Sequence, residues 1–315
     1  MRCPLLRDEK VRSCRAAPFR KSLARSAAGG EEGRCSTPAH AFCPVAPRGR
    51  ESRSGPCCPF LEETFVQFCA AAPVPTYVPW SSSPEARCGH DGHRFCESFR
   101  AAAGDAGRGP AHPSTGAAAT VADVEGVPAP GWLYYAENHA WLDPGDDDLW
   151  HLGLDAFLAR VVGSVERLAF LAVRAPARPA VVLTVRGVDL TLVFPRGQGI
   201  VAANTRLRSR LDRLTADPYG LGWLFTVRAP ATPSFAGLRR GAAAREWMAN
   251  EVRRLEGLVH ACLASRGDRL AADGGRLVPD LLARLEREEA LRLLADLFPL
   301  PDAAPDRPSA GSRIA

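Results

Sequence analysis

The chain has 315 residues, a length typical of one to three domains. Its 46% hydrophobic and 24% charged residues indicate a soluble globular protein rather than a disordered one. The net charge of +5 is modest, and we find no clustered Arg/Lys patch of the kind that binds nucleic acid. No apolar run is long enough to span a membrane, and we expect no secretory signal peptide. We therefore expect a cytoplasmic protein with reduced thiols.

The chain begins with a stretch of low complexity. Residues 1–55 show no periodicity and are rich in Arg, Ser, Ala, Pro and Gly, which predicts a disordered basic tail. Residues 56–100 form a cysteine-containing segment. Residues 101–130 are rich in Ala, Gly and Pro and are interpreted as a linker.

The cysteine-containing segment has the side chains of a metal site. Thiolates and imidazoles close together in sequence are ligands of zinc and of iron–sulfur clusters. A short segment with few apolar residues favours such a site, whereas the absence of a Cys-x-x-Cys pair favours buried structural thiols. If a metal is bound, the expected ligands are Cys58, Cys69, Cys88 and Cys96, with His90 or His93 as substitutes. An iron–sulfur cluster there would make the chain an electron-transfer protein.

Residues 132–228 are mostly strand-like. Two apolar, β-branched runs, residues 181–185 and 190–194, flank a short Gly-containing segment and predict a β-hairpin. Residues 154–160 predict a short helix with Asp155 near its start.

Residues 237–300 have helical periodicity. One apolar stripe has alternating spacings of four and three and consists of Met248, Val252, Leu255, Val259 and Cys262. A break at Asp273-Gly274-Gly275 is followed by Pro279, which suits the first turn of a second, leucine-rich helix. We expect the two helices to form a hairpin against the β domain or a partner chain, followed by a disordered tail at residues 301–315.

Three landmarks stand in order within residues 131–230. They are Tyr-Tyr-Ala-Glu-Asn-His-Ala-Trp at residues 134–141, Gly-Leu-Asp-Ala-Phe-Leu-Ala-Arg-Val-Val-Gly at residues 153–163 and Asp-Pro-Tyr-Gly-Leu-Gly-Trp-Leu at residues 217–224. This arrangement resembles the H protein of the glycine cleavage system, which carries lipoate on a lysine. The resemblance implies an α+β chain in which a lipoyl-type, barrel-sandwich-hybrid β domain lies between the cysteine-containing segment and the C-terminal helical pair.

The lysine that the resemblance requires is missing. By comparison with the family, its position falls at Arg186 or Gly187, and the only lysines of the chain are Lys10 and Lys21. Acylation needs an amine that can deprotonate, which a guanidinium cannot supply. We therefore expect no lipoate on this chain.

Three functions remain open. The first is a non-lipoylated H protein-like module that serves as a protein-binding scaffold or regulatory partner. The second is a metal or iron–sulfur electron-transfer protein that docks through the lipoyl-like domain, and the third is a lipoyl-pathway carrier by homology only. We find no Ser-His-Asp arrangement, phosphate-binding loop or metal-hydrolase motif, so we do not expect an enzyme. His139 has no evident catalytic partner and is interpreted as a structural histidine.

Overall fold

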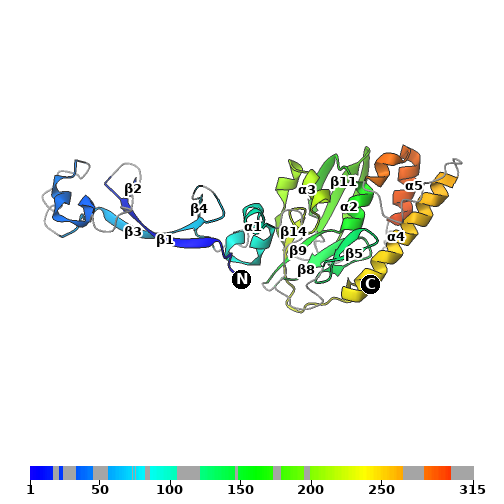
Figure 1. Cartoon of the computed structure of the whole chain (residues 1–315), viewed down its shortest axis with the longest axis horizontal. Helices are drawn as coiled ribbons and strands as arrows, with labels where there is room; N and C mark the ends of the chain where they lie inside the picture. Colours follow the sequence, from blue (N-terminus) through cyan, green and yellow to red (C-terminus); the bar gives the residue numbers. More distant parts are fainter. Residues whose placement is uncertain are drawn as a thin grey trace, which may run out of the picture. The chain divides into compact units, whose positions relative to one another are not determined.

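The computed structural model divides the chain into two compact units (Figure 1). The N-terminal unit is Arg2–Gly89, and the C-terminal unit is His90–Ala315 together with Met1. The structure describes residues 1–16, 21–23, 33–44, 56–72, 74, 76–81, 86–104, 121–145, 148–172, 179–194, 199–264 and 280–298. The tail expected at residues 301–315 lies outside this part of the chain.

The N-terminal unit is built on one antiparallel sheet with the strand order β2-β1-β3-β4. Its strands are β1 (Leu6–Cys14), β2 (Lys21–Leu23), β3 (Leu61–Cys69) and β4 (Thr76–Val78), and its 3-10 helices are η1 (Arg34–Ser36), η2 (Pro38–Phe42) and η4 (Arg87–Gly89). β1 pairs with β3 along its whole length, with Leu6 opposite Cys69 and Cys14 opposite Leu61. The described part of residues 1–55 thus contains β1, β2, η1 and η2 rather than the disordered tail expected there. β1 finds its partner strand far along the chain, which local composition does not reveal.

Very little apolar surface is buried in the N-terminal unit. Among its described residues, the buried apolar side chains are Leu6, Cys3, Cys14 and Cys58. Across the central strand pair, Lys10 and Arg12 form ion pairs with Glu63. Exposed ion pairs of this kind contribute little stability. Three of the four buried apolar side chains in the described part of this unit are cysteines.

The C-terminal unit combines strands and helices in a mixed fold. A six-stranded antiparallel sheet has the order β13-β14-β9-β8-β7-β15, a second sheet has the order β10-β11-β12, and β5 pairs with β6. The strands are β5 (Val121–Val124), β6 (Val127–Pro130), β7 (Tyr134–Tyr135), β8 (Ala140–Asp143), β9 (Leu149–Leu154), β10 (Arg167–Ala172), β11 (Pro179–Val185), β12 (Val188–Val193), β13 (Ile200–Ala203), β14 (Phe225–Arg228) and β15 (Arg239–Arg240). The helical elements are η5 (Asp91–Phe95), α1 (Glu97–Ala102), α2 (Ala156–Val162), η7 (Thr205–Arg208), α3 (Asp212–Ala216), α4 (Gly241–Ala264), η8 (Leu281–Arg284) and α5 (Arg287–Leu297).

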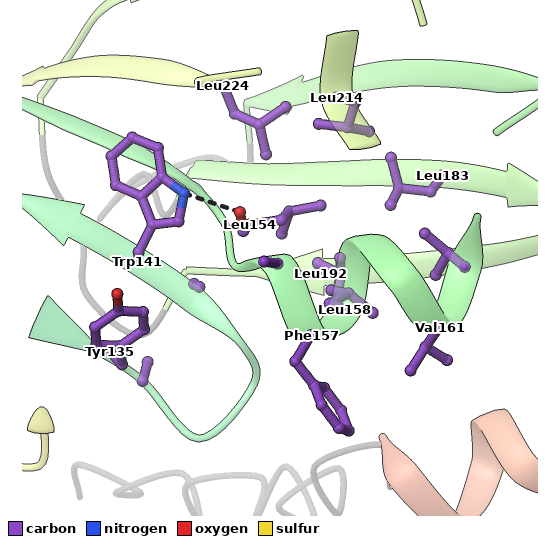
Figure 2. Close-up of a cluster of buried hydrophobic side chains, with 14 of the residues drawn as sticks. Tyr135, Trp141, Leu154, Phe157, Leu158, Val161, Leu183, Leu192, Leu214 and Leu224 are labelled. Atoms are coloured by element: carbon purple, nitrogen blue, oxygen red, sulfur yellow. Dashed lines mark hydrogen bonds between the residues drawn. The ribbon is translucent and has the colours of Figure 1, made fainter. Parts of the chain in front are cut away.

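One hydrophobic core joins both larger sheets of this unit to α2 (Figure 2). Leu183 of β11 and Leu224, just before β14, belong to the same cluster as Phe157 and Leu158 of α2. The helix begins where the sequence predicts, because the Asp155 carboxylate accepts a hydrogen bond from the Leu158 backbone N–H at 2.9 Å. This is the N-cap interaction that satisfies an otherwise unpaired helical donor.

The last two helices, α4 and α5, lie side by side (Figure 1). Apolar residues of both helices belong to this core. Met248, Val252 and Leu255 of α4 are buried, as their spacing predicts. We expected one leucine-rich helix after Pro279, and the structure differs. Pro279 itself lies outside the described residues. The leucine-rich segment forms η8 and then α5, whose N-cap Glu286 and Glu289 form a reciprocal capping box that starts a new helix. No helix in the described part of the chain is long and apolar enough to cross a membrane.

Residues predicted to be linker also belong to the fold. Residues 121–130 form the β5–β6 hairpin, although much of the predicted linker, residues 105–120, lies outside the described residues. Phe95 is buried in the core and stacks on His151 with 4.1 Å between ring centroids. The predicted boundary at residue 100 therefore falls inside a packed segment. Phe95 is a single buried apolar residue in this segment, and a single residue forms no periodic pattern from which its burial could be predicted.

Candidate functional site

The position expected for the lipoyl lysine is the tip of the β11–β12 hairpin. Val185 pairs with Val188, so Arg186 and Gly187 alone form the loop. Their φ angles are +53° and +71°. A two-residue loop with both φ values positive is the type I′ turn that suits the twist of a hairpin, and glycine is favoured at its second position. The structure confirms the predicted hairpin. Its loop consists of only these two residues.

The Arg186 side chain is bonded to the C-terminal segment. Its guanidinium Nη1 donates to the backbone carbonyls of Leu282 and Leu285, at the end of η8. The Leu282 carbonyl also accepts from the Leu285 N–H at 3.4 Å, and a cation is favourable beside carbonyls at a helix C-terminus. The neighbouring Gly187 N–H donates to Glu166 Oε2 at 3.1 Å. Arg186 therefore connects the hairpin tip to η8.

All three landmarks meet at one tryptophan. Trp141 Nε1 donates to the Leu154 carbonyl at 2.8 Å (Figure 2) and to the Pro218 carbonyl at 3.1 Å. Gly153 lies against the indole, and a Cβ atom there would be 2.7 Å from Trp141 Nε1. The glycine is needed because the ring occupies the space of a side chain.

The third landmark is a hydrogen-bonded turn that holds several elements together. The Asp217 carboxylate accepts from the Leu221 N–H at 2.8 Å and forms a buried ion pair with Arg100. The Tyr219 hydroxyl donates to the Pro128 carbonyl at 2.8 Å and accepts from the Ala156 N–H at 3.0 Å. Asp217 and Tyr219 thus connect this turn to α1, β6 and α2.

His139 has carboxylate partners that its sequence neighbours do not reveal. Its Nδ1 lies 2.8 Å from Asp155 Oδ2, and its Nε2 lies 3.8 Å from Glu251 Oε2. Burial lowers the pKa of His139, but Asp155 and Glu251 outweigh burial and raise the pKa to about 9. The ring is 1% exposed and stacks on Phe157. The expectation of a histidine without a partner is wrong, but the closed surroundings give this ion pair a structural role.

The four cysteines predicted as one metal site are not brought together. Cys58 precedes β3 and Cys69 ends it, and a strand of nine residues is about 30 Å long at roughly 3.3 Å per residue. Cys58 and Cys69 therefore cannot bind the same ion. Cys88 lies near the Cys69 end of β3. The Cys3 N–H donates to the Cys88 carbonyl at 2.9 Å, and Cys3 stands just before Leu6, which pairs with Cys69. Cys96, His90 and His93 belong to the C-terminal unit.

A different set of thiols gathers around Cys35. Burial raises the pKa of the Cys35 thiol, and the thiols of Cys58, Cys14 and Cys43 raise it further, Cys58 also through a side-chain hydrogen bond. None of the ten cysteines, all of which lie in described parts of the chain, forms a disulfide. In the described residues, no three His, Cys, Asp or Glu side chains are already arranged as a metal site.

A repeat in the sequence relates the cysteines of this region to one another. Cys-Pro-Leu-Leu at residues 3–6 matches Cys-Pro-Phe-Leu at residues 58–61, and Cys14 matches Cys69 at the same offset. The pattern Arg-Cys-x-x-x-x-His-x-Phe-Cys occurs at residues 34–43 and again at residues 87–96. Each copy therefore contributes four cysteines and one histidine in the same order.

Comparisons with known proteins relate about a third of the chain to one family. The chain is 28% identical over 113 residues to the glycine cleavage system H protein of Pseudoalteromonas atlantica, covering 35% of this chain and 87% of that protein. It is 28% identical over 106 residues to the same protein of Thermosynechococcus vestitus, covering 32% and 82%. A solved glycine cleavage system H protein from Mycobacterium marinum is 20% identical, with 38% of this chain and 98% of that chain covered and a TM-score of 0.30. No protein-family model matches the chain. The chain thus contains a glycine cleavage system H protein-like domain.

Proposed function

We propose that this chain is an H protein-like module that carries no lipoate and acts in the cytoplasm by binding another protein, as a scaffold or regulatory partner rather than an enzyme. We further infer that the two larger sheets of the C-terminal unit adopt the barrel-sandwich arrangement that the resemblance implies. Support for that arrangement comes from the single core to which both sheets contribute.

One observation carries the proposal: Arg186 occupies the hairpin tip, and its guanidinium is bonded to the carbonyls of Leu282 and Leu285. A guanidinium stays protonated and cannot attack an activated acyl group. A swinging arm also needs a mobile attachment point, whereas Arg186 is tied to η8. The tip therefore serves as a structural contact in this chain.

Lipoylation can be tested directly. The full chain is co-expressed with a lipoate–protein ligase and lipoate, and its intact mass is measured. We expect no adduct on the wild-type chain, whose only lysines are Lys10 and Lys21. An H protein that keeps its lysine controls for ligase activity, and Arg186→Lys and Gly187→Lys report whether a restored amine at the turn is accepted. A lipoyl-sized adduct on the wild-type chain would refute the proposal.

The binding role needs a separate measurement. The tagged full chain is purified from its native host at native expression and run on gel filtration with mass detection. We expect it to comigrate with a second protein in a fixed ratio. A chain that migrates alone under these conditions removes the scaffold role while leaving the absence of lipoate intact.

Electron transfer through an iron–sulfur cluster is the second candidate, and it is favoured by the thiols gathered around Cys35. Anaerobic purification followed by iron analysis and visible absorption tests it. A colourless, iron-free and folded protein would exclude this role.

A further inference from the structure

The pairing of β1 with β3 brings together cysteines from the two copies of the repeat. Cys14 lies opposite Leu61, whose N–H donates to the Cys58 carbonyl at 3.0 Å. Next to this pair, the Arg15 N–H donates to the Phe60 carbonyl at 2.9 Å. Both Cys14 and Cys58 are buried. The second cysteine of the first copy is thus held beside the first cysteine of the second copy.

The 3-10 helices bring two more cysteines to the same place. The Cys58 N–H donates to the Cys35 carbonyl at 2.7 Å, which fixes η1 against the turn before β3. The thiols acting on Cys35 are those of Cys58, Cys14 and Cys43. Cys43 follows η2, and its N–H donates to the His40 carbonyl at 2.9 Å. Three thiols from three separate segments, those of Cys14, Cys43 and Cys58, therefore lie around the thiol of Cys35.

His40, three residues before Cys43, adds a buried imidazole to the N-terminal unit. Its side chain is 2% exposed, and its Nδ1 lies 2.7 Å from the Thr37 carbonyl. The other ring nitrogen, Nε2, is buried and has no hydrogen-bond partner among the described residues. A buried, unpaired polar atom costs free energy unless an ion or another group satisfies it.

The unit also needs a source of stability. No described residue of Arg2–Gly89 belongs to the hydrophobic core cluster. Its large apolar side chains include Phe65, Tyr77 and Trp80, each more than 60% exposed. Small units without a core are usually stabilised by disulfides or a structural metal, and no disulfide links its cysteines.

We propose that the N-terminal unit binds one zinc ion through Cys14, Cys35, Cys43 and Cys58, so that the second copy of the repeat lends its first cysteine to the first copy. Four thiolates are a common donor set for structural zinc. Each thiol releases its proton to solvent as it binds. Because the thiols are not yet at ligand spacing, binding includes rotation of the cysteine side chains, and the unit becomes more ordered as the ion binds.

Adjacent cysteines provide a matched test of the ligand set. Zinc content is measured by mass spectrometry on the purified full chain and on single serine variants. We expect Cys58→Ser to lose one equivalent of zinc relative to wild type, and Cys57→Ser, which alters an exposed thiol next to it, to lose none. The double variant Cys14→Ser/Cys58→Ser should lose the same single equivalent as either variant alone. Full zinc content in Cys14→Ser, or a larger loss in the double variant, would overturn the proposal.

A measurement on the wild-type chain avoids variants that fail to fold. The protein is stripped with a chelator, returned to zinc alone or left without metal, and its thiols are alkylated and identified by mass spectrometry. We expect zinc to slow alkylation of Cys14, Cys35, Cys43 and Cys58 together, while Cys57 and Cys262 react equally in both samples. Unchanged rates at the four thiols, or iron with sulfide in place of zinc in the native protein, would overturn the proposal.

Discussion

The His139–Asp155–Glu251 group should make the stability of the C-terminal unit depend on pH. The pKa of His139 rises from 6.5 to about 9 on folding. At roughly 1.4 kcal/mol per pKa unit, this rise corresponds to about 3 kcal/mol of stability. Because the pKa is raised in the folded state, the contribution is fully present below pH 6.5 and is lost as the pH rises to about 9. The free energy of unfolding should therefore fall by about 3 kcal/mol between pH 6 and pH 10 through this histidine.

The measurement is urea denaturation at a series of pH values, followed by tryptophan fluorescence. Trp80→Phe removes the tryptophan of the N-terminal unit, so the signal comes from the C-terminal unit. His139→Asn is the matched control, because asparagine tolerates the positive φ of +60° at this position but does not titrate. The difference between the two proteins isolates the histidine. Parallel pH profiles for histidine and asparagine would refute the reasoning.

Three further substitutions test individual contacts. Gly153→Ala should destabilise the C-terminal unit by about 1–3 kcal/mol, because its methyl group would collide with Trp141, and an unchanged denaturation midpoint would contradict this. Arg100→Met should cost about 3–5 kcal/mol, because it leaves the Asp217 carboxylate buried without its cation, and the same denaturation assay measures it. Arg186→Met should speed hydrogen exchange in η8 while leaving the strands of the β11–β12 hairpin protected, and equal exchange in both proteins would show that the arginine does not hold η8.

Sequence patterns predict those helices and hairpins that are determined by residues close together in the sequence. Asp155 caps its helix through its own side chain, and the hairpin around Arg186 and Gly187 follows from two β-branched runs and a glycine. Contacts between distant residues were not predictable in this way. Glu251 reaches His139 from a helix far along the chain, and no periodicity links the two.

The cysteines show a different limit. Grouping Cys58 with Cys69 relies on closeness in sequence, but an extended strand separates residues that a helix or loop would keep near each other. The repeat is visible in the sequence, and it would have suggested equivalent positions. It would not have revealed the exchange of Cys58 into the neighbourhood of Cys35, because that depends on the pairing of β1 with β3.

The register of the N-terminal sheet has a consequence for the origin of this chain. β1 and β3 are equivalent strands of the two copies, and they pair about a point where Lys10 lies opposite its own counterpart, Phe65. The outer strand pairs correspond in the same way. Arg12 lies opposite Leu23 in the first copy, and their counterparts Gln67 and Val78 lie opposite each other in the second copy. A single copy would therefore present the strand edge needed to join an identical copy in the same register. The tandem chain contains, in covalent form, the interface of a two-fold symmetric homodimer.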